Sequence, residues 1–245
     1  MAVPPAPAQS SDATDASLRE ALEVVDSLRQ NGDFRAALSR LNTLRNAHPR
    51  EVDVLWRLVY TWTDLGQATD DKNKRTNFYE NALEVARTGL AADSSSARAH
   101  LALAVAQGRA ALNAGTQERI RRSRAVKRHS DRSIAIDSTL AGAYHVRGRW
   151  HREVEALGFF QRAIVKTVYG GLPESSLEQA VRDFERAIAL DDEVFHHLEL
   201  AKTYRQMDRP EDARRELQTV LDMPEEDPFD PEYKKEAREL LEDLD

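Results

Sequence analysis

Residues Tyr144–Asp191 read YHVRGRWHREVEALGFFQRAIVKTVYGGLPESSLEQAVRDFERAIALD, and their small and large side chains follow a regular spacing. The positions that carry this spacing are Tyr144, Gly148, Ala180, Phe184, Ala187 and Asp191. When about 20 residues between Gly148 and Ala180 are treated as an insert, the order is that of a two-helix repeat: large, small, then alanine, aromatic, alanine and a helix stop. Gly148 and Ala180 then lie where two antiparallel helices approach most closely, because only a side chain of at most one carbon fits there. We expect Phe184 and Tyr144 to fill the space on either side.

This is the spacing of the tetratricopeptide (TPR) motif, and parts of it recur along the chain. A first repeat has its interhelical turn at Gly32–Ala37 and closes at Pro49. The second and third repeats open near Val52 and Ala97, the stretch Tyr144–Asp191 belongs to the fourth, and the fifth has its first helix around Leu200–Tyr204. The sequence therefore predicts an all-α, TPR-like, right-handed superhelical array of about five antiparallel helix pairs with long inserts and a C-terminal capping helix.

The ends of the array follow from composition and periodicity. Residues 1–13 are rich in Pro, Ala and Ser, so we expect a disordered N-terminal tail. The repeat domain is predicted over residues 14–228, and residues 229–245 are predicted to form the capping helix that an open array needs. Within the repeats we expect a turn at Gly66, a polar insert at Ala68–Thr76 and a second helix over Thr116–Ile136.

The composition limits the possible functions. The chain of 245 residues is 41% hydrophobic, which suits one large array, and it contains no cysteine. Disulfides, thiolate metal sites and cysteine nucleophiles are thereby excluded. The net charge of −7 argues against a general nucleic-acid binder. No run of about 18 apolar residues is present, so we expect no transmembrane segment.

Several motifs resemble those of the regulator of microtubule dynamics family, which includes the tyrosine-phosphatase-interacting tether of the outer mitochondrial membrane. The motifs are Ile120-Arg121-Arg122-Ser123 with Lys127-x3-Asp131, His145-x2-Gly148-Arg149-Trp150-x3-Val154-x2-Leu157, Tyr169-Gly170-Gly171-Leu172-Pro173-x-Ser175, Glu178-x-Ala180-x3-Phe184-x2-Ala187 and Leu200-Ala201-Lys202-Thr203-Tyr204. The match covers Val54–Leu241. The resemblance implies links to microtubules, organelle contact sites and, for the tether, phospholipid binding by the TPR domain. The eukaryotic membrane anchor and the tether's ER-partner motif are not found here, so we expect a prokaryotic member and do not carry that cell biology over.

The first helix of each TPR repeat lines the concave face of the array. The groove-facing motif positions of the third to fifth repeats carry the basic residues Arg98, Arg109, Arg149, Arg152, Lys202 and Arg205, with few acids beside them. Because Arg forks match carboxylate and phosphate oxygens, this groove is predicted to hold an anionic ligand. The alternative is that these cations pair with acids on the second helices and only stabilise the array.

Arg149 and Arg152, with His145 and Lys202 on flanking turns, are predicted to form the centre of the anion site. Arg149 and Arg152 are three apart and share a helix face. Lys202 holds in the fifth repeat the motif position of Arg149 in the fourth, so stacking should bring their charges together. We expect replacement of both arginines to leave the free array unharmed.

The aromatic residues Trp150, Phe159 and Phe160 have two possible roles. Trp150 is included among the predicted ligand-binding residues, because an apolar floor beside the basic groove would accommodate a lipid-like molecule. We favour core packing for these aromatic side chains, and the apolar floor is the alternative.

Residues Glu118–Arg132 form a basic run. A nucleic-acid or membrane-surface patch is conceivable, but no aromatic residue is interleaved to stack on bases. We favour a solvated face on a helix that packs against the array through Val126 and Ile134.

Enzymatic motifs are missing from the sequence. His196 and His197 are adjacent and therefore point in different directions on a helix. No HExxH motif or phosphate-binding loop is present. We predict a non-enzymatic binding module with no cofactor and no metal.

Two binding functions stay open. In the first, the groove holds a phospholipid-like or other phosphate- or carboxylate-bearing molecule. In the second, it receives an acidic peptide or C-terminus of a protein partner. The stretch Ala6–Gln9 resembles the end of a secretory signal, so the bacterial cytoplasm and an exported location after signal removal are both possible.

Overall fold

The computed structural model describes residues 9–244, and within this range the regular structure is helical with no strand. The helices are α1 (Gln9–Gln30), α2 (Phe34–Ala47), α3 (Val52–Gln67), α4 (Lys72–Ala92), α5 (Ala97–Ala111), α6 (Thr116–Ile136), α7 (Ala141–Glu155), α8 (Phe159–Tyr169), α9 (Leu177–Leu190), α10 (Val194–Gln206), α11 (Pro210–Asp222) and α12 (Asp230–Glu242).

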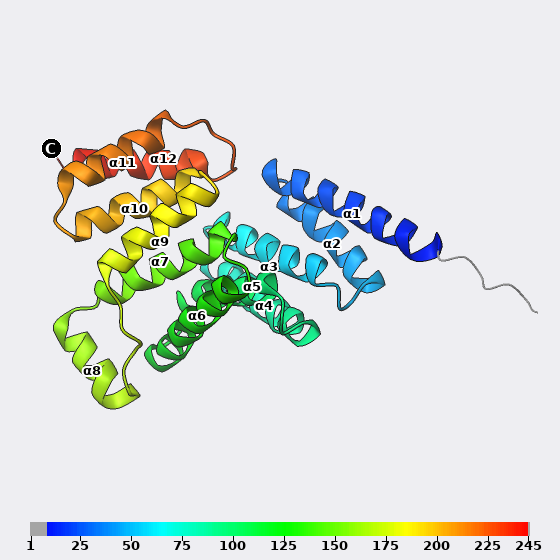
Figure 1. The fold of residues 1–245 in the computed structure, drawn as a ribbon, viewed down its shortest axis with the longest axis horizontal. Helices are drawn as coiled ribbons and strands as arrows, with labels where there is room; N and C mark the ends of the chain where they lie inside the picture. Colours follow the sequence, from blue (N-terminus) through cyan, green and yellow to red (C-terminus); the bar gives the residue numbers. More distant parts are fainter. Residues whose placement is uncertain (1–8, 245) are drawn as a thin grey trace, which may run out of the picture.

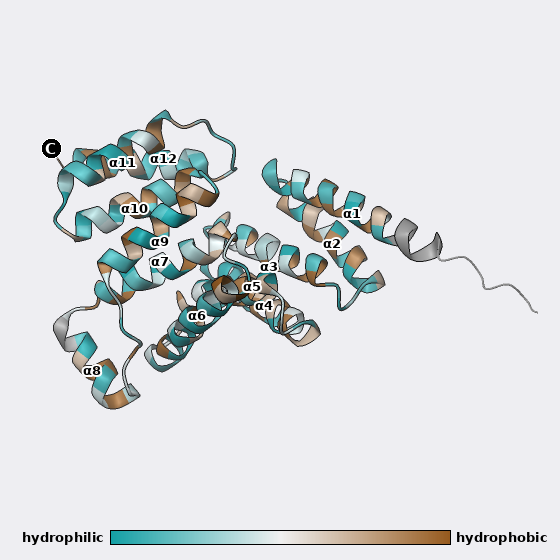
Figure 2. Ribbon diagram, in the orientation of Figure 1, coloured by the Kyte–Doolittle hydropathy of each residue, from teal (hydrophilic) through white to brown (hydrophobic). Residues whose placement is uncertain are grey.

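The helices pack as the predicted TPR-like array (Figure 1). Pairs form between α1 and α2, α3 and α4, α5 and α6, α7 and α9, and α10 and α11, while α12 packs on α10 and α11. Figure 2 shows hydrophobic and hydrophilic positions alternating around the helices, as burial of one face of each helix requires. The all-α class and the repeat architecture predicted from the sequence are confirmed.

The fourth repeat has the close helix crossing that its small residues predict. Ala180, Phe184 and Ala187 of α9 are fully buried. A Cβ added at Gly148 of α7 would stand 3.1 Å from the Phe184 ring, so the ring occupies the space that the missing side chain leaves. Tyr144 differs from the expectation, because it is only half-buried and lies beneath a guanidinium group, that of Arg147.

A second close crossing corrects the expected turn at Gly66. Gly66 lies inside α3, where a Cβ would stand 2.2 Å from Cε1 of Tyr79 in α4. The Tyr79 side chain is 2% exposed and therefore cannot move aside freely. Gly66 is a packing position, and the chain turns after Gln67.

The inserts and the N-terminus also differ in part from the expectation. Within the polar stretch Ala68–Thr76, helix α4 already begins at Lys72, because the Asp71 side chain caps it by accepting from the backbone N–H groups of Asn73 and Lys74. The fourth-repeat insert forms α8, which ends at Gly170 with φ 75°. Helix α1 begins at Gln9, so residues 9–13 of the expected tail are helical, whereas residues 1–8 lie outside the described part.

The first helices of successive repeats contact one another, α3 with α5, α5 with α7 and α7 with α10. We call the side formed by α1, α3, α5, α7 and α10 the inner wall. Ion pairs join its first members, with Arg57 of α3 2.7 Å from Asp26 of α1 and Arg29 of α1 2.8 Å from Asp64 of α3.

The segment between α11 and α12 returns to the N-terminal repeats (Figure 1). The Phe229 ring stacks on Phe34 with a centroid separation of 5.5 Å. Gln67 of α3 donates to the Tyr233 hydroxyl of α12 at 2.8 Å. The fully buried Asp230 shapes this segment by accepting from the backbone N–H of Glu226 and of Asp227. The C-terminal helix is therefore tied to the second repeat as well as to the fifth.

Candidate functional site

Three of the predicted groove cations converge on one carboxylate, that of Glu199 in α10. Nη2 of Arg152 lies 2.7 Å from Oε2, and Nε of Arg149 lies 3.5 Å from the same oxygen. Nζ of Lys202 lies 3.2 Å from Oε1. Because the two arginines belong to α7 and the other two residues to α10, the cluster joins the fourth and fifth repeats across the inner wall.

Two further acids, both exposed, form ion pairs with the cations that surround Glu199. Glu153 lies 3.1 Å from Arg149, and Glu236 of α12 lies 2.8 Å from Lys202. Their side chains are 53% and 43% exposed, whereas that of Glu199 is 10% exposed. Glu199 is the buried centre of the cluster, and the other two acids lie at its rim.

Electrostatics keep this cluster ionised. Burial raises the pKa of Glu199, but the charges of Arg149, Arg152 and Lys202 together outweigh burial and hold that pKa well below its usual range. Glu199 in turn raises the pKa of Arg149 more than burial lowers it. Removing one partner would leave a buried charge without compensation, which is costly.

The expectation that few acids lie beside these cations is wrong. Sequence reasoning misses Glu199 because it stands outside the motif positions that face a TPR groove. Its place three residues before Lys202, on the same helix face, is the signal that could have found it. The structure does bring Arg149 and Lys202 together, as their equivalent motif positions predict. Their part in holding a ligand stays a prediction.

His145 is enclosed by neighbouring aromatic side chains. Its Nδ1 lies 2.8 Å from Nδ1 of His196, and its ring packs edge-on against Phe184 and Phe195. Burial, followed by the interaction with His196, lowers the pKa of His145 well below its usual value. A neutral imidazole supplies no positive charge to an anion site.

Trp150 packs in the core rather than beside a ligand. The residue is 4% exposed and forms a cluster with Val126 of α6 and Val154 of α7. Its Nε1 donates to the Ser123 hydroxyl at 2.9 Å. The core packing that the sequence favours is what the structure shows for Trp150. The side chains of Phe159 and Phe160 lie outside the described part.

The remaining groove cations are not bound to a buried acid. The Arg98 guanidinium lies 5.1 Å from the centroid of the Trp56 ring, and Arg109 donates to the Gln67 side chain at 2.8 Å. Among the described side chains, those of residues 15–158 and 161–244, neither arginine forms an ion pair. Arg205 lies 3.4 Å from Asp243, whose side chain is 65% exposed. Arg98 and Arg109 are therefore the groove cations whose charge a partner could neutralise, whereas Arg205 already has an exposed acidic partner.

The basic run Glu118–Arg132 lies in α6. Ile120, Ala125 and Val126 are buried, while Arg121 and Arg128 are exposed. The run is therefore a helix that packs on the array and turns a basic face to solvent, as the sequence indicates.

Among the described side chains, no cluster of three or more His, Cys, Asp or Glu residues could hold a metal ion. None of the helices in residues 9–244 has the length and apolar character needed to span a bilayer.

Comparison with known proteins gives a family match over most of the chain. Residues 21–245 match the model described as "Regulator of microtubule dynamics protein 1-3". Regulator of microtubule dynamics protein 1 of Bos taurus is 28% identical over 228 residues, which cover 91% of this chain and 71% of that protein. Regulator of microtubule dynamics protein 3 of Mus musculus is 25% identical over 234 residues, which cover 92% of this chain and 50% of that protein.

Solved structures support the same fold. A thermophilic TPR protein of Thermus thermophilus has a TM-score of 0.65 at 19% identity, and the alignment covers 91% of this chain and 98% of that one. At this identity the likeness concerns the fold alone, which is a TPR fold.

Proposed function

We propose that the inner wall of this chain, which belongs to the regulator of microtubule dynamics protein 1-3 family, receives an acidic segment of a partner protein. TPR arrays are protein-interaction modules whose partner is set by the residues of the groove. The proposal rests on the position and the unpaired charge of Arg98 and Arg109 among the described side chains. Both lie on α5 of the inner wall, and neither forms an ion pair with the described side chains of residues 15–158 and 161–244.

The spacing of these charges favours an extended ligand. Arg98 and Arg109 are eleven residues apart on α5, which corresponds to about 16 Å along the helix axis. A single phosphate or carboxylate group cannot contact both guanidinium groups across that length. An extended peptide, which rises about 3.3 Å per residue, spans it with about five residues.

The other candidate, a lipid head group or small anion at Arg149, Arg152 and Lys202, has less support. A compact anion would need clustered cations that are not neutralised, but this cluster already holds Glu199. Native mass spectrometry of freshly purified protein separates the two candidates, because a co-purifying lipid mass would favour the small ligand.

A peptide-binding experiment tests the proposal. The probe is a fluorescein-labelled peptide of about twelve residues rich in Asp and Glu, followed by fluorescence polarisation at two salt concentrations. Arg98→Gln/Arg109→Gln should weaken binding at least about tenfold, because each charge-assisted hydrogen bond contributes about 1.5–3 kcal/mol.

Arg182→Gln/Arg186→Gln is the matched control, since it removes two exposed arginines of α9 and changes the net charge equally. We expect wild-type affinity from this control. An equal loss in both double variants would mean that only net charge matters, and unchanged binding by Arg98→Gln/Arg109→Gln would contradict the proposal.

A further inference from the structure

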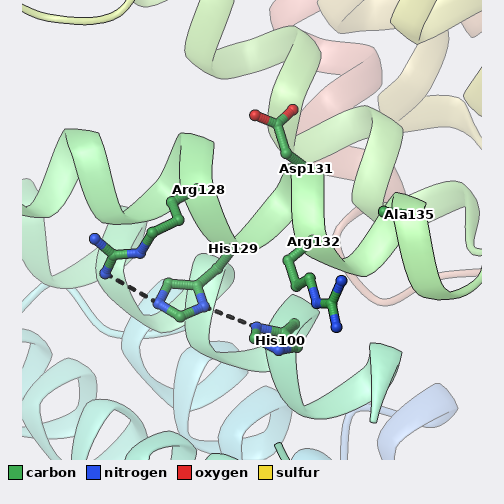
Figure 3. A pocket seen from close by; sticks show the side chains of 6 residues that line it. All are labelled: His100, Arg128, His129, Asp131, Arg132 and Ala135. Carbon is green, nitrogen blue, oxygen red and sulfur yellow. Dashed lines mark hydrogen bonds between the residues drawn. The ribbon is translucent and has the colours of Figure 1, made fainter. Parts of the chain in front are cut away.

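A cavity of about 510 Å³ lies between α5 and α6, formed by residues that the proposed function does not use. The residues that line it are His100, Arg128, His129, Asp131, Arg132 and Ala135 (Figure 3). It is a depression that opens widely to solvent, and most of its lining residues belong to α6.

A chain of hydrogen bonds fixes the floor of this cavity. Arg128 can only donate, so Nε2 of His129 accepts from it at 3.3 Å. The Nδ1–H of His129 then donates to Nδ1 of His100 at 2.9 Å, and Nε2–H of His100 donates to the Ser94 carbonyl at 3.1 Å. Every ring nitrogen is used with both imidazoles neutral.

Burial supports the neutral state of both rings. It is the main cause that lowers the pKa of His129 to about 4, with a further contribution from Arg128. Burial likewise lowers the pKa of His100, to which the charges of Arg132 and Arg128 add. The two arginines are therefore the source of positive charge at this cavity.

The next feature of the cavity is the charge of Arg128 and Arg132. Neither arginine forms an ion pair with an acid among the side chains of residues 15–158 and 161–244. The one carboxylate of the lining, Asp131, is bound to Lys127 at 2.6 Å and to Arg147 at 3.3 Å. Figure 3 shows the Asp131 carboxylate pointing away from the imidazole pair. Arg128 and Arg132 are four residues apart and share one face of α6.

We propose that this cavity binds a phosphate monoester, with Arg128 and Arg132, which flank the His100–His129 pair in Figure 3, turning toward the phosphate from either side. Two guanidinium groups match the charge of about −1.5 to −2 that a phosphate monoester carries at neutral pH. A carboxylate would neutralise only one of them. Guanidinium forks also bind phosphate oxygens in a bidentate way, which favours arginine at such a site. The neutral imidazole faces and Ala135 leave room for the organic part of the ester.

Calorimetric titration at pH 7.5 with phenyl phosphate, and with benzoate as the matched carboxylate, tests the proposal. Wild-type protein should bind phenyl phosphate with a dissociation constant below about 1 mM and benzoate at least about tenfold more weakly. Arg128→Gln/Arg132→Gln should bind phenyl phosphate at least about tenfold more weakly than wild type. Its melting temperature should fall only slightly, because both side chains are exposed, neither forms an ion pair with a described side chain, and the hydrogen bond that is lost is the 3.3 Å one from Arg128 to His129.

Arg182→Gln/Arg186→Gln is again the control for net charge and should bind as wild type does. NMR spectra of the wild type provide a readout that does not depend on any variant, because phenyl phosphate should shift the imidazole signals of His100 and His129. No saturation below about 10 mM overturns the proposal, as does equal affinity for benzoate. Undiminished binding by Arg128→Gln/Arg132→Gln, an equal loss in the control, or unshifted imidazole signals also overturns it.

Discussion

At the scale of single residues, the structure changes the role that the sequence assigns to Arg149, Arg152 and Lys202. Their positions follow from the TPR motif, and the approach of Arg149 to Lys202 follows from the equivalence of neighbouring repeats. The presence of Glu199 between them does not follow, because the motif describes which positions face the groove and not how a buried side chain turns. The cluster therefore holds two repeats together, and removing Arg149 and Arg152 should destabilise the free array, contrary to the sequence-based expectation.

Glu199→Gln tests this structural role. The substitution leaves three cations around a neutral amide, and breaking a buried ion pair in this way costs about 3–5 kcal/mol. We expect a melting temperature at least about 6 °C lower, since 1 kcal/mol shifts it by about 2–4 °C in a chain of this size.

Glu153→Gln is the matched control by circular dichroism. Its side chain is 53% exposed, and exposed pairs contribute about 0–1 kcal/mol, so its melting temperature should stay within about 4 °C of wild type. A Glu199→Gln protein as stable as the control would show that the cluster does not join the repeats.

At the scale of helices, hydrophobic periodicity and turn residues predicted most of the repeat pairs. The second helix of the third repeat has the predicted bounds, Thr116–Ile136. Ser130 and Ser133, which match the motif poorly, are fully buried, and the Ser133 hydroxyl donates to the Ala97 carbonyl. Prediction was weaker at α4, because its first turn is polar and is recognised only by the cap that Asp71 supplies. Gly66 was misplaced because glycine marks a turn and a close helix crossing equally well.

Gly66→Ala tests the close crossing between α3 and α4. The new methyl group would stand 2.2 Å from the Tyr79 ring, and overpacking of this kind costs about 1–3 kcal/mol. The gain of up to about 1 kcal/mol from replacing a helical glycine does not offset a clash with a buried ring. The melting temperature should fall.

Gly89→Ala is the control, because the nearest atom to its new methyl group lies 3.6 Å away. Here the helix-propensity gain should dominate, and the melting temperature should stay the same or rise. If both variants melt alike, Tyr79 can leave its position at little cost, and the crossing is looser than the structure indicates.

At the scale of the whole molecule, the existence of the repeats could be predicted from the sequence, but the rotation of each repeat relative to the next could not. The contact of Phe229 with Phe34 and of Tyr233 with Gln67 depends on the rotation between successive repeats. Small differences in helix packing set this rotation, and motif spacing does not record them. The inner wall is consequently bounded by α12 on one side, an arrangement that favours an extended segment lying along α5, α7 and α10.

Hydrogen–deuterium exchange of the wild-type protein, with and without the acidic peptide, tests the central claim that the inner wall binds the partner. We predict slower exchange in α3, α5, α7 and α10 when the peptide is bound, and no such change in Arg98→Gln/Arg109→Gln. Protection confined to α4, α6, α9 and α11 would place the peptide on the other side of the array and contradict the account.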